Sequence, residues 1–217
     1  MSSTTVTDVS PSPAIMLRSA DGQIALGPLH AALLPFIERW FNVLETDRTQ
    51  GDQPGPRIRE RVQRWMARVT SSDDMAMFAI YVSTLTDVGE QVQPIGMTWL
   101  SNIDERQRTA SFAISIGDDT VRGRGYGTTT TRLMLDYAFH ALGLHHVSLE
   151  VFSNNPAGVT AYTRAGFREC GRYHEQYRHG QEVHDVILME CLQPWFASAN
   201  VAMPTDVQSL FSPDVPR

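Results

Sequence analysis

The segment RGRGYG (residues 122–127) places three glycines and two arginines directly before the helical pattern TTTTRLMLDYAFHALG (residues 128–143). Glycine has no Cβ, so the backbone there can approach a ligand closely. The free N–H groups at the start of a helix form an anion-binding site. The segment therefore predicts a phosphate-binding loop at a strand-to-helix junction.

Known glycine-loop patterns narrow the identity of the phosphate. A P-loop has a lysine after its last glycine, whereas this chain has Thr128 at that position. A dinucleotide fingerprint starting at Gly123 would need a glycine where Thr128 stands, although Glu150 lies at about the right distance downstream for a ribose contact. A plain tight turn would not need the two arginines. The pattern R-x-x-G-x-G fits the segment without a mismatch.

The composition is that of an ordinary globular protein, with 42% hydrophobic and 19% charged residues in a chain of 217. Cys170 and Cys191 are too few for a disulfide framework or a zinc site. The net charge of −6 argues against a nucleic-acid partner. Neither a membrane-spanning run nor a signal peptide is recognisable, so we expect a cytoplasmic protein without a membrane partner.

Hydrophobic periodicity predicts one mixed α/β domain over residues 14–192, between a disordered N-terminal tail (1–13) and a C-terminal tail (193–217). The strands are expected as a pair within 14–29, a meander at 75–83, 93–103 and 109–117 with loops at 86–93 and 104–108, a strand at 145–152 buried on both faces, and a hairpin within 167–191. The helices are expected within 30–44, 57–69, 128–143 and 155–166, with a loop at 47–56.

Two further motifs follow the glycine loop in order. LGLHHVSLEV (142–151) and AYTRAGF (161–167) flank Asn155 and, together with the pattern formed by Arg122, Gly125 and Gly127, resemble the GCN5-related N-acetyltransferases (GNAT), particularly the branch that includes ribosomal-protein alanine acetyltransferases. The similarity is close over residues 121–167 and looser over 15–192. It implies a mostly antiparallel twisted sheet of about seven strands with a splayed parallel pair, flanked by about four helices.

The resemblance implies transfer of an acetyl group from acetyl-CoA to a primary amine by direct attack in a ternary complex, without a metal. The implied coenzyme A contacts are the main chain of Ile114, Ser115 and Ile116, the loop residues Arg122, Gly123, Arg124, Gly125, Tyr126, Gly127 and Thr128, and the side chains of Asn155 and Arg164. Asn155 also fits a helix N-cap, and Arg164 fits equally well a solvated surface position.

The resemblance assigns to Tyr162 the protonation of the departing thiolate; a core tyrosine is the alternative. A phenol is about 1.5 pKa units less acidic than a thiol, so this transfer is uphill by about 2 kcal/mol. The general base is open, because Ser111 occupies the place where many relatives carry a glutamate. Glu150, expected in the interior, Asp104, Glu105 and water are the candidates.

The acceptor is not named by the sequence. A protein N-terminus and small amines such as an antibiotic, a polyamine or an amino acid all remain open, and residues 44–61 lie where the family builds its acceptor wall. The evenly spaced His174, His179 and His184 are compatible with metal ligation, substrate contact or simple exposure. The alternative to an enzyme is a regulatory or scaffold protein that binds coenzyme A; the presence of Tyr162 favours the enzyme. A homodimer is a further expectation.

Overall fold

The computed structural model describes residues 14–42, 56–87 and 89–198. The expected N-terminal tail, nearly all of the loop predicted at 47–56 and most of the C-terminal tail lie outside these residues. Within them, an eight-stranded sheet has the order β1-β2-β3-β4-β5-β6-β8-β7. The strands are β1 (Leu17–Arg18), β2 (Ile24–Pro28), β3 (Ala76–Thr86), β4 (Gly89–Asp104), β5 (Thr109–Ile116), β6 (His146–Phe152), β7 (Arg168–His179) and β8 (Glu182–Leu192).

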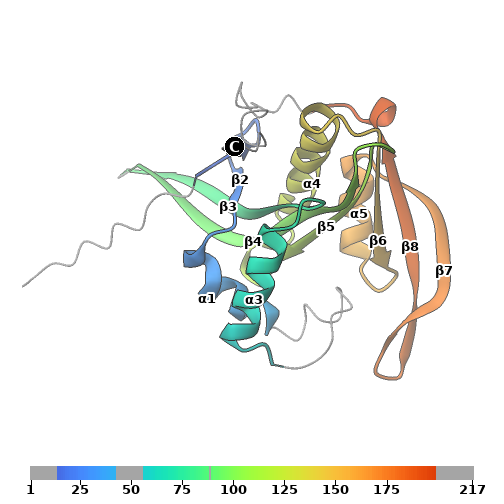
Figure 1. Cartoon of the computed structure of the whole chain (residues 1–217), viewed down its shortest axis with the longest axis horizontal. Coiled ribbons are helices and arrows are strands. Elements are labelled where there is room, and N and C mark those ends of the chain that lie inside the picture. The colour runs from blue at the N-terminus through green and yellow to red at the C-terminus, as the bar shows by residue number, and fades with distance from the viewer. Residues whose placement is uncertain (1–13, 43–55, 88, 199–217) are drawn as a thin grey trace, which may run out of the picture.

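Neighbouring strands are antiparallel except β5 and β6, which are parallel. The mixed α/β class and the parallel pair are thus confirmed, with eight strands instead of about seven. The antiparallel β7–β8 hairpin extends from one side of the molecule (Figure 1).

Four α-helices flank the sheet in the described part of the chain, as expected. They are α1 (Leu34–Phe41), α3 (Arg59–Thr70), α4 (Tyr126–Asp136), which continues into a π-helical turn (Tyr137–Ala141), and α5 (Pro156–Ala165). Short 3₁₀ turns occur at Ala31–Leu33, Asp119–Val121 and Gln193–Trp195. Pro35 is tolerated because it lies in the first turn of α1, where its missing N–H is not needed. No helix in the described ranges has the length and apolarity that crossing a membrane takes.

The two faces of the sheet carry separate hydrophobic clusters. Alternate residues of a strand point to opposite faces, and in β3 Ala79 and Tyr81 pack with α1 and α3, whereas Phe78 and Ile80 pack with α4. Asn42, directly after α1, accepts through its side-chain oxygen from the Arg57 N–H at 2.8 Å, shortly before α3 begins. The sheet therefore separates an α1/α3 face from an α4/α5 face (Figure 1).

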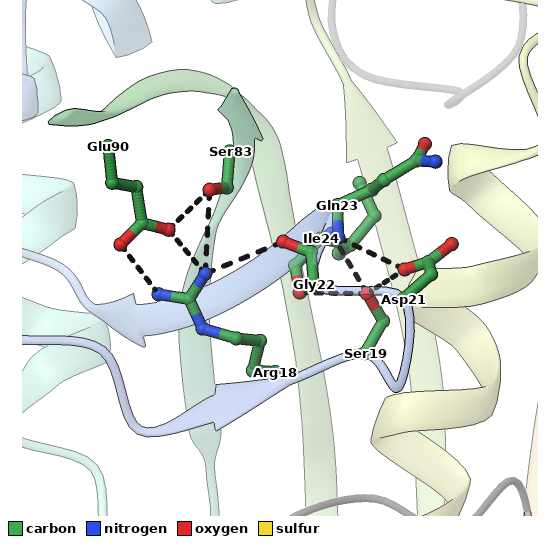
Figure 2. Close-up of polar contacts among 8 residues, drawn as sticks. All are labelled: Arg18, Ser19, Asp21, Gly22, Gln23, Ile24, Ser83 and Glu90. Atoms are coloured by element: carbon green, nitrogen blue, oxygen red, sulfur yellow. Dashed lines mark hydrogen bonds and ion pairs between the residues drawn. The ribbon is translucent and has the colours of Figure 1, made fainter. Parts of the chain in front are cut away.

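The loop predicted at 86–93 is wrong, because β3 and β4 remain paired as far as Thr86 and Gly89. One polar cluster ties this extended hairpin to β1: the guanidinium of Arg18 donates to Glu90 and to Ser83, and the Ser83 hydroxyl also donates to Glu90 (Figure 2). These hydrogen bonds hold the pKa of Glu90 below its usual range, and the bond from Ser83 has the largest effect. The sequence signal for a loop, Gly89 among polar residues, was overridden by pairing between the strands.

A smaller polar cluster closes the β1–β2 turn beside it. The Ser19 hydroxyl donates to Asp21 at 2.6 Å, and the Gln23 N–H donates to the same carboxylate at 3.0 Å (Figure 2). These bonds, led by that from Ser19, lower the pKa of Asp21. The pair of strands predicted within residues 14–29 is therefore confirmed, with Gly22 at a φ of 72° in the turn between them.

The expectation that residues 145–152 form a strand buried on both faces is also wrong. Burial along β6 alternates: Val147, Leu149 and Val151 are buried, whereas Glu150 is exposed. The segment has a strict period of two, with Ser148 and Glu150 on the second face. Only one face of this strand is therefore covered by the core.

Candidate active site

The parallel strands β5 and β6 separate partway along their length. They pair from Thr109 and His146 to Ser111 and Ser148. Beyond this point β5 stays paired with β4 as far as Ile116, and β6 stays paired with β8 as far as Phe152. The facing edges of residues 112–116 and 149–152 consequently form no strand pair with each other, and their main chain can take an extended ligand as an added strand. Ile114, Ser115 and Ile116 lie on this edge, where main-chain contacts were predicted.

The glycine loop lies at the wide end of this divergence. Gly123 and Gly125 have φ angles of 75° and 84°, and a Cβ on either would meet no atom within 4 Å. The space above the loop is thus open, and the left-handed backbone favours glycine. A Cβ on Gly127 would lie 3.7 Å from the Ile116 side chain and 4.0 Å from that of Ala161, so the loop sits between the end of β5 and α5.

The first turn of α4 presents its amides to that space. The first helical hydrogen bond runs from the Thr129 N–H to the Gly125 carbonyl at 3.1 Å. The N–H groups before it, from Tyr126 to Thr128, have no acceptor within the helix, as at every helix start. Aligned amides and the helix dipole suit a pyrophosphate dianion.

The charged residues of the loop are exposed, and one of them is already paired. Arg122 forms an ion pair with Asp119 at 2.5 Å, and Arg124 extends into solvent without a carboxylate partner among the described residues. Asp118 accepts from the hydroxyl and the N–H of Thr120, and the hydroxyl bond is the main reason that its pKa is lowered. Arg124 is therefore the better placed of the two arginines for a new anion.

Asn155 caps α5, as the alternative interpretation of this residue required. Its side-chain oxygen accepts from the Gly158 N–H at 2.9 Å. Because the oxygen is used by the cap, the amide nitrogen remains as a donor, and it has no protein partner among the described residues. Capping and donation to a bound carbonyl are thus compatible. Arg164 lies exposed in the last turn of the same helix.

Tyr162 lies on the α4/α5 face where β5 and β6 begin to separate. Its ring contacts Phe112 edge-on at 6.1 Å and Phe167 at 6.2 Å. Phe112 directly follows Ser111, the last β5 residue paired with β6. Desolvation raises the pKa of Tyr162 to about 12, so its hydroxyl is protonated across the physiological range. Phe112 was not among the predicted site residues, although its position next to Ser111 in sequence could have indicated it.

Glu150 approaches the divergence from the opposite face. Met97 packs under α1 and α3, and its β5 partner Ser115 shares that face, as Ser111 does by alternation. Ser111 is in register with Ser148, so Ser148 and Glu150 also point to the α1/α3 face. Glu150 is exposed and has no ion-pair partner among the described residues, which corrects its expected burial. Tyr162 and Glu150 therefore flank the divergence from its two sides.

The other carboxylates proposed from the sequence lie elsewhere. Asp104 is the last residue of β4 and Glu105 follows in the turn to β5, where Asp104 accepts from the Gln107 N–H at 2.8 Å. This turn adjoins Thr109, at the paired end of β5 and β6. Three residues of strand, about 10 Å, separate Thr109 from Phe112. The structure thus does not bring this turn together with Tyr162.

An aromatic cluster on the α1/α3 face of strands β6, β7 and β8 was not predicted from the sequence. Phe152 and Tyr177 stack with their ring centroids 3.8 Å apart, and His184 lies 6.2 Å from Tyr177. Phe152 is two residues after Glu150 and shares its face, so this cluster borders the exposed carboxylate. Sequence separation hid it, because Phe152 and Tyr177 come from β6 and β7.

The evenly spaced histidines do not converge. His174 lies 3.5 Å from Asp185, and His184 lies 3.4 Å from Glu182. Across the described residues, no group of three or more His, Cys, Asp or Glu side chains could hold a metal ion.

Comparison with known proteins agrees with this geometry. A family model described as an acetyltransferase (GNAT) domain matches residues 25–168. Spermidine N(1)-acetyltransferase of Vibrio cholerae serotype O1 is 35% identical over 99 residues, which are 46% of this chain and 57% of that protein. The Escherichia coli K12 spermidine N(1)-acetyltransferase is 32% identical over 87 residues, 40% of this chain and 46% of that protein. The chain thus spans about half the length of these curated relatives.

Similarity in three dimensions is more extensive. The crystal structure of spermidine N-acetyltransferase from Vibrio cholerae in complex with CoA and spermine superposes with a TM-score of 0.71 at 26% identity, covering 80% of this chain and 97% of that one. These relatives are named for spermidine, whereas the motifs pointed towards the ribosomal-protein alanine branch. The family itself is confirmed, because its model matches well over half of the sequence: the chain belongs to the GNAT acetyltransferases.

Proposed function

We propose that this protein is an acetyl-CoA-dependent N-acetyltransferase that acts on a primary amine. The observation that carries the proposal is the divergence of β5 and β6 beyond Ser111 and Ser148, with the open glycine loop at its wide end and Tyr162 beside its start. An extended thioester with a pyrophosphate at one end fits these three features in that order. Because the proposed acetyl donor is acetyl-CoA, we also expect a cytoplasmic location.

The proposed coenzyme A contacts use main-chain and side-chain donors near the divergence of β5 and β6. The loop from Arg122 to Thr128 would hold the pyrophosphate through its amides, with Arg124 adding charge. The free edge of residues 114–116 would pair with the pantetheine arm, and the Asn155 amide nitrogen would donate to one of its carbonyls. A metal has no role in this scheme.

The two titratable side chains have complementary roles. Acetyl-CoA supplies an activated acetyl carbonyl with a thiolate leaving group. Glu150, on the α1/α3 face, would take one proton from the acceptor ammonium, directly or through water, so that the neutral amine can attack the acetyl carbonyl. Tyr162, on the α4/α5 face, would donate a hydrogen bond to the sulfur as the carbon–sulfur bond breaks. The new amide bond replaces the thioester bond, and the second proton lost by the amine nitrogen passes through water to the departing thiolate, so that coenzyme A leaves as the free thiol without a covalent enzyme intermediate.

The acceptor would be an amine that reaches Glu150 from the α1/α3 face. The matched relatives are named for spermidine, and the aromatic pair Phe152 and Tyr177 next to Glu150 suits an alkylammonium, because aromatic faces attract cations. Polyamines and other alkylamines are therefore the first acceptors to test.

A thiol-release assay with acetyl-CoA across a panel of amines tests the proposal. We expect release of free thiol that depends on an amine, with one acetyl group added to the product by mass spectrometry. The chain has no lysine, so acetylation of its own side-chain amines cannot contribute to the signal. Binding of coenzyme A without turnover on any amine, including spermidine, aminoglycosides, amino acids and peptide N-termini, would reverse the proposal in favour of a regulatory protein.

A further inference from the structure

One basic hollow lies apart from the divergence of β5 and β6. It has a volume of about 420 Å³ and is lined by four arginines and two aromatic rings: Arg57, Arg61, Arg64, Arg68, Phe41 and Trp65. This volume is within the range of small-molecule sites. The hollow lies between the end of α1 and one side of α3 and uses none of the residues proposed for acetyl transfer.

The arginines of the hollow lie on one side of α3. Arg61, Arg64 and Arg68 are three, four and seven residues apart, which places their guanidinium groups on neighbouring turns. All three are exposed, and none has a carboxylate partner among the described residues. Like charges at this spacing destabilise a helix. A bound anion would be attracted by all three guanidinium groups and would offset their mutual repulsion.

The aromatic wall is well ordered by its own contacts. Phe41 packs edge-on against Trp65 with ring centroids 4.9 Å apart, and the guanidinium of Arg57 lies 5.1 Å from the Phe41 ring centre. The Arg57 main chain is fixed by two hydrogen bonds with the Asn42 side chain. The hollow therefore combines a fixed apolar surface with several donors that match carboxylate or phosphate geometry.

The charge of this region contrasts with that of the chain. Residues 57–68 contain five arginines and one glutamate in a protein of net charge −6. Arg59 is different from the other four, because it does not line the hollow; its guanidinium lies 3.0 Å from the Glu38 carboxylate. A polycation such as a polyamine would be repelled here.

We propose that this hollow binds a small anion that carries an aromatic ring, with the carboxylate or phosphate held by Arg61, Arg64 and Arg68 and the ring against Trp65 and Phe41. The anion can be part of the amine acceptor or a separate ligand. The proposal does not depend on turnover, since binding can be measured directly.

Phenyl phosphate is the probe, titrated calorimetrically into the protein saturated with coenzyme A so that the glycine loop is filled. We expect saturable binding that is weaker for inorganic phosphate and for phenol, since each lacks one half of the proposed contacts. The double variant Arg61→Gln/Arg64→Gln should weaken phenyl phosphate by about tenfold or more, because charge-assisted hydrogen bonds are lost. Arg59→Gln, which removes one positive charge from the same helix outside the hollow, should leave affinity unchanged.

Kinetics separate the two sources of the anion. If it belongs to the acceptor, phenylalanine should have a lower KM than phenethylamine, and Arg61→Gln/Arg64→Gln should abolish that difference. If the ligand is separate, both amines should behave alike while phenyl phosphate still binds. Absent binding of phenyl phosphate, or equal binding by the double variant and Arg59→Gln with thermal stability preserved, would overturn the proposal.

Discussion

Removal of the Tyr162 hydroxyl is the sharpest test of the proposed chemistry. Partial burial against Phe112 and Phe167 desolvates the phenol and raises its pKa to about 12. Against a free thiol of about 8.5, complete transfer of its proton would be uphill by about 3.5 units, or about 5 kcal/mol. This is more than the 1.5 units expected for an ordinary tyrosine, although the same desolvation also raises the pKa of a thiol held beside it.

The hydroxyl therefore acts mainly as a hydrogen-bond donor to the developing thiolate. A hydrogen bond to a charged group contributes about 1.5–3 kcal/mol, which corresponds to about 10–100-fold in rate. Tyr162→Phe should lower kcat by this factor in the thiol-release assay, with little change in the dissociation constant of acetyl-CoA. The loss should shrink with an acyl donor whose leaving group is more acidic.

Tyr137→Phe is the matched control. Tyr137 lies in the π-helical turn after α4, and its buried hydroxyl has no hydrogen-bond partner among the described residues. Burial also raises the pKa of Tyr137 to about 12. Its loss should leave kcat unchanged. A near-normal kcat for Tyr162→Phe would show that Tyr162 only packs against Phe112, and an equal loss in acetyl-CoA affinity would assign it to binding.

The raised pKa also predicts a pH dependence. Because the folded-state pKa of Tyr162 lies above the ordinary value of about 10, its contribution to stability is complete below pH 10 and is lost as the pH rises towards about 12. Tyr162→Phe should remove that contribution to the alkaline loss of stability, measured by thermal unfolding between pH 9 and 12. An unchanged alkaline profile in the variant would contradict the assigned burial of the phenol.

Three further substitutions test the site around Tyr162. Gly125→Ala should raise the KM for acetyl-CoA at least tenfold, because its φ of 84° disfavours a Cβ and the methyl group would enter the open space where the phosphate is expected. Gly127→Ala, at a negative φ with ordinary contacts, should have little effect on this KM. Similar KM values for the two variants would refute the proposed phosphate site. Asn155→Asp should keep the helix cap and the melting temperature but weaken acetyl-CoA binding, whereas Asn155→Ala should also cost about 1 kcal/mol of unfolding free energy; unchanged binding in both variants would leave only the cap. Glu150→Gln should lower kcat by about 10²-fold without loss of stability, since the side chain is exposed, and unaltered kcat would assign the base to water.

The parts of the site that could be predicted depend on short-range backbone chemistry. The left-handed glycines, the helix start at Tyr126 and the cap at Asn155 each follow from neighbours within a few residues. The burial of Glu150 was misjudged because the apolar residues around it outweighed the period of two along β6. The stacked pair Phe152 and Tyr177 depends on strand order, which no local pattern contains.

The topology explains why these features meet at one place. A parallel pair requires a crossover, and here α4 connects β5 to β6, so its first turn must lie beyond the carboxyl end of β5. The strands also separate towards their carboxyl ends, because the last pair joins Ser111 to Ser148. The unpaired edges and the unpaired helix amides consequently open in the same direction. Because α5 packs beside α4, it places Tyr162 next to Phe112, where the separation begins, while Glu150 points to the other face. An extended thioester bound along this line would have its phosphates at the amides and its sulfur between the two titratable groups, which is the arrangement that direct acetyl transfer requires.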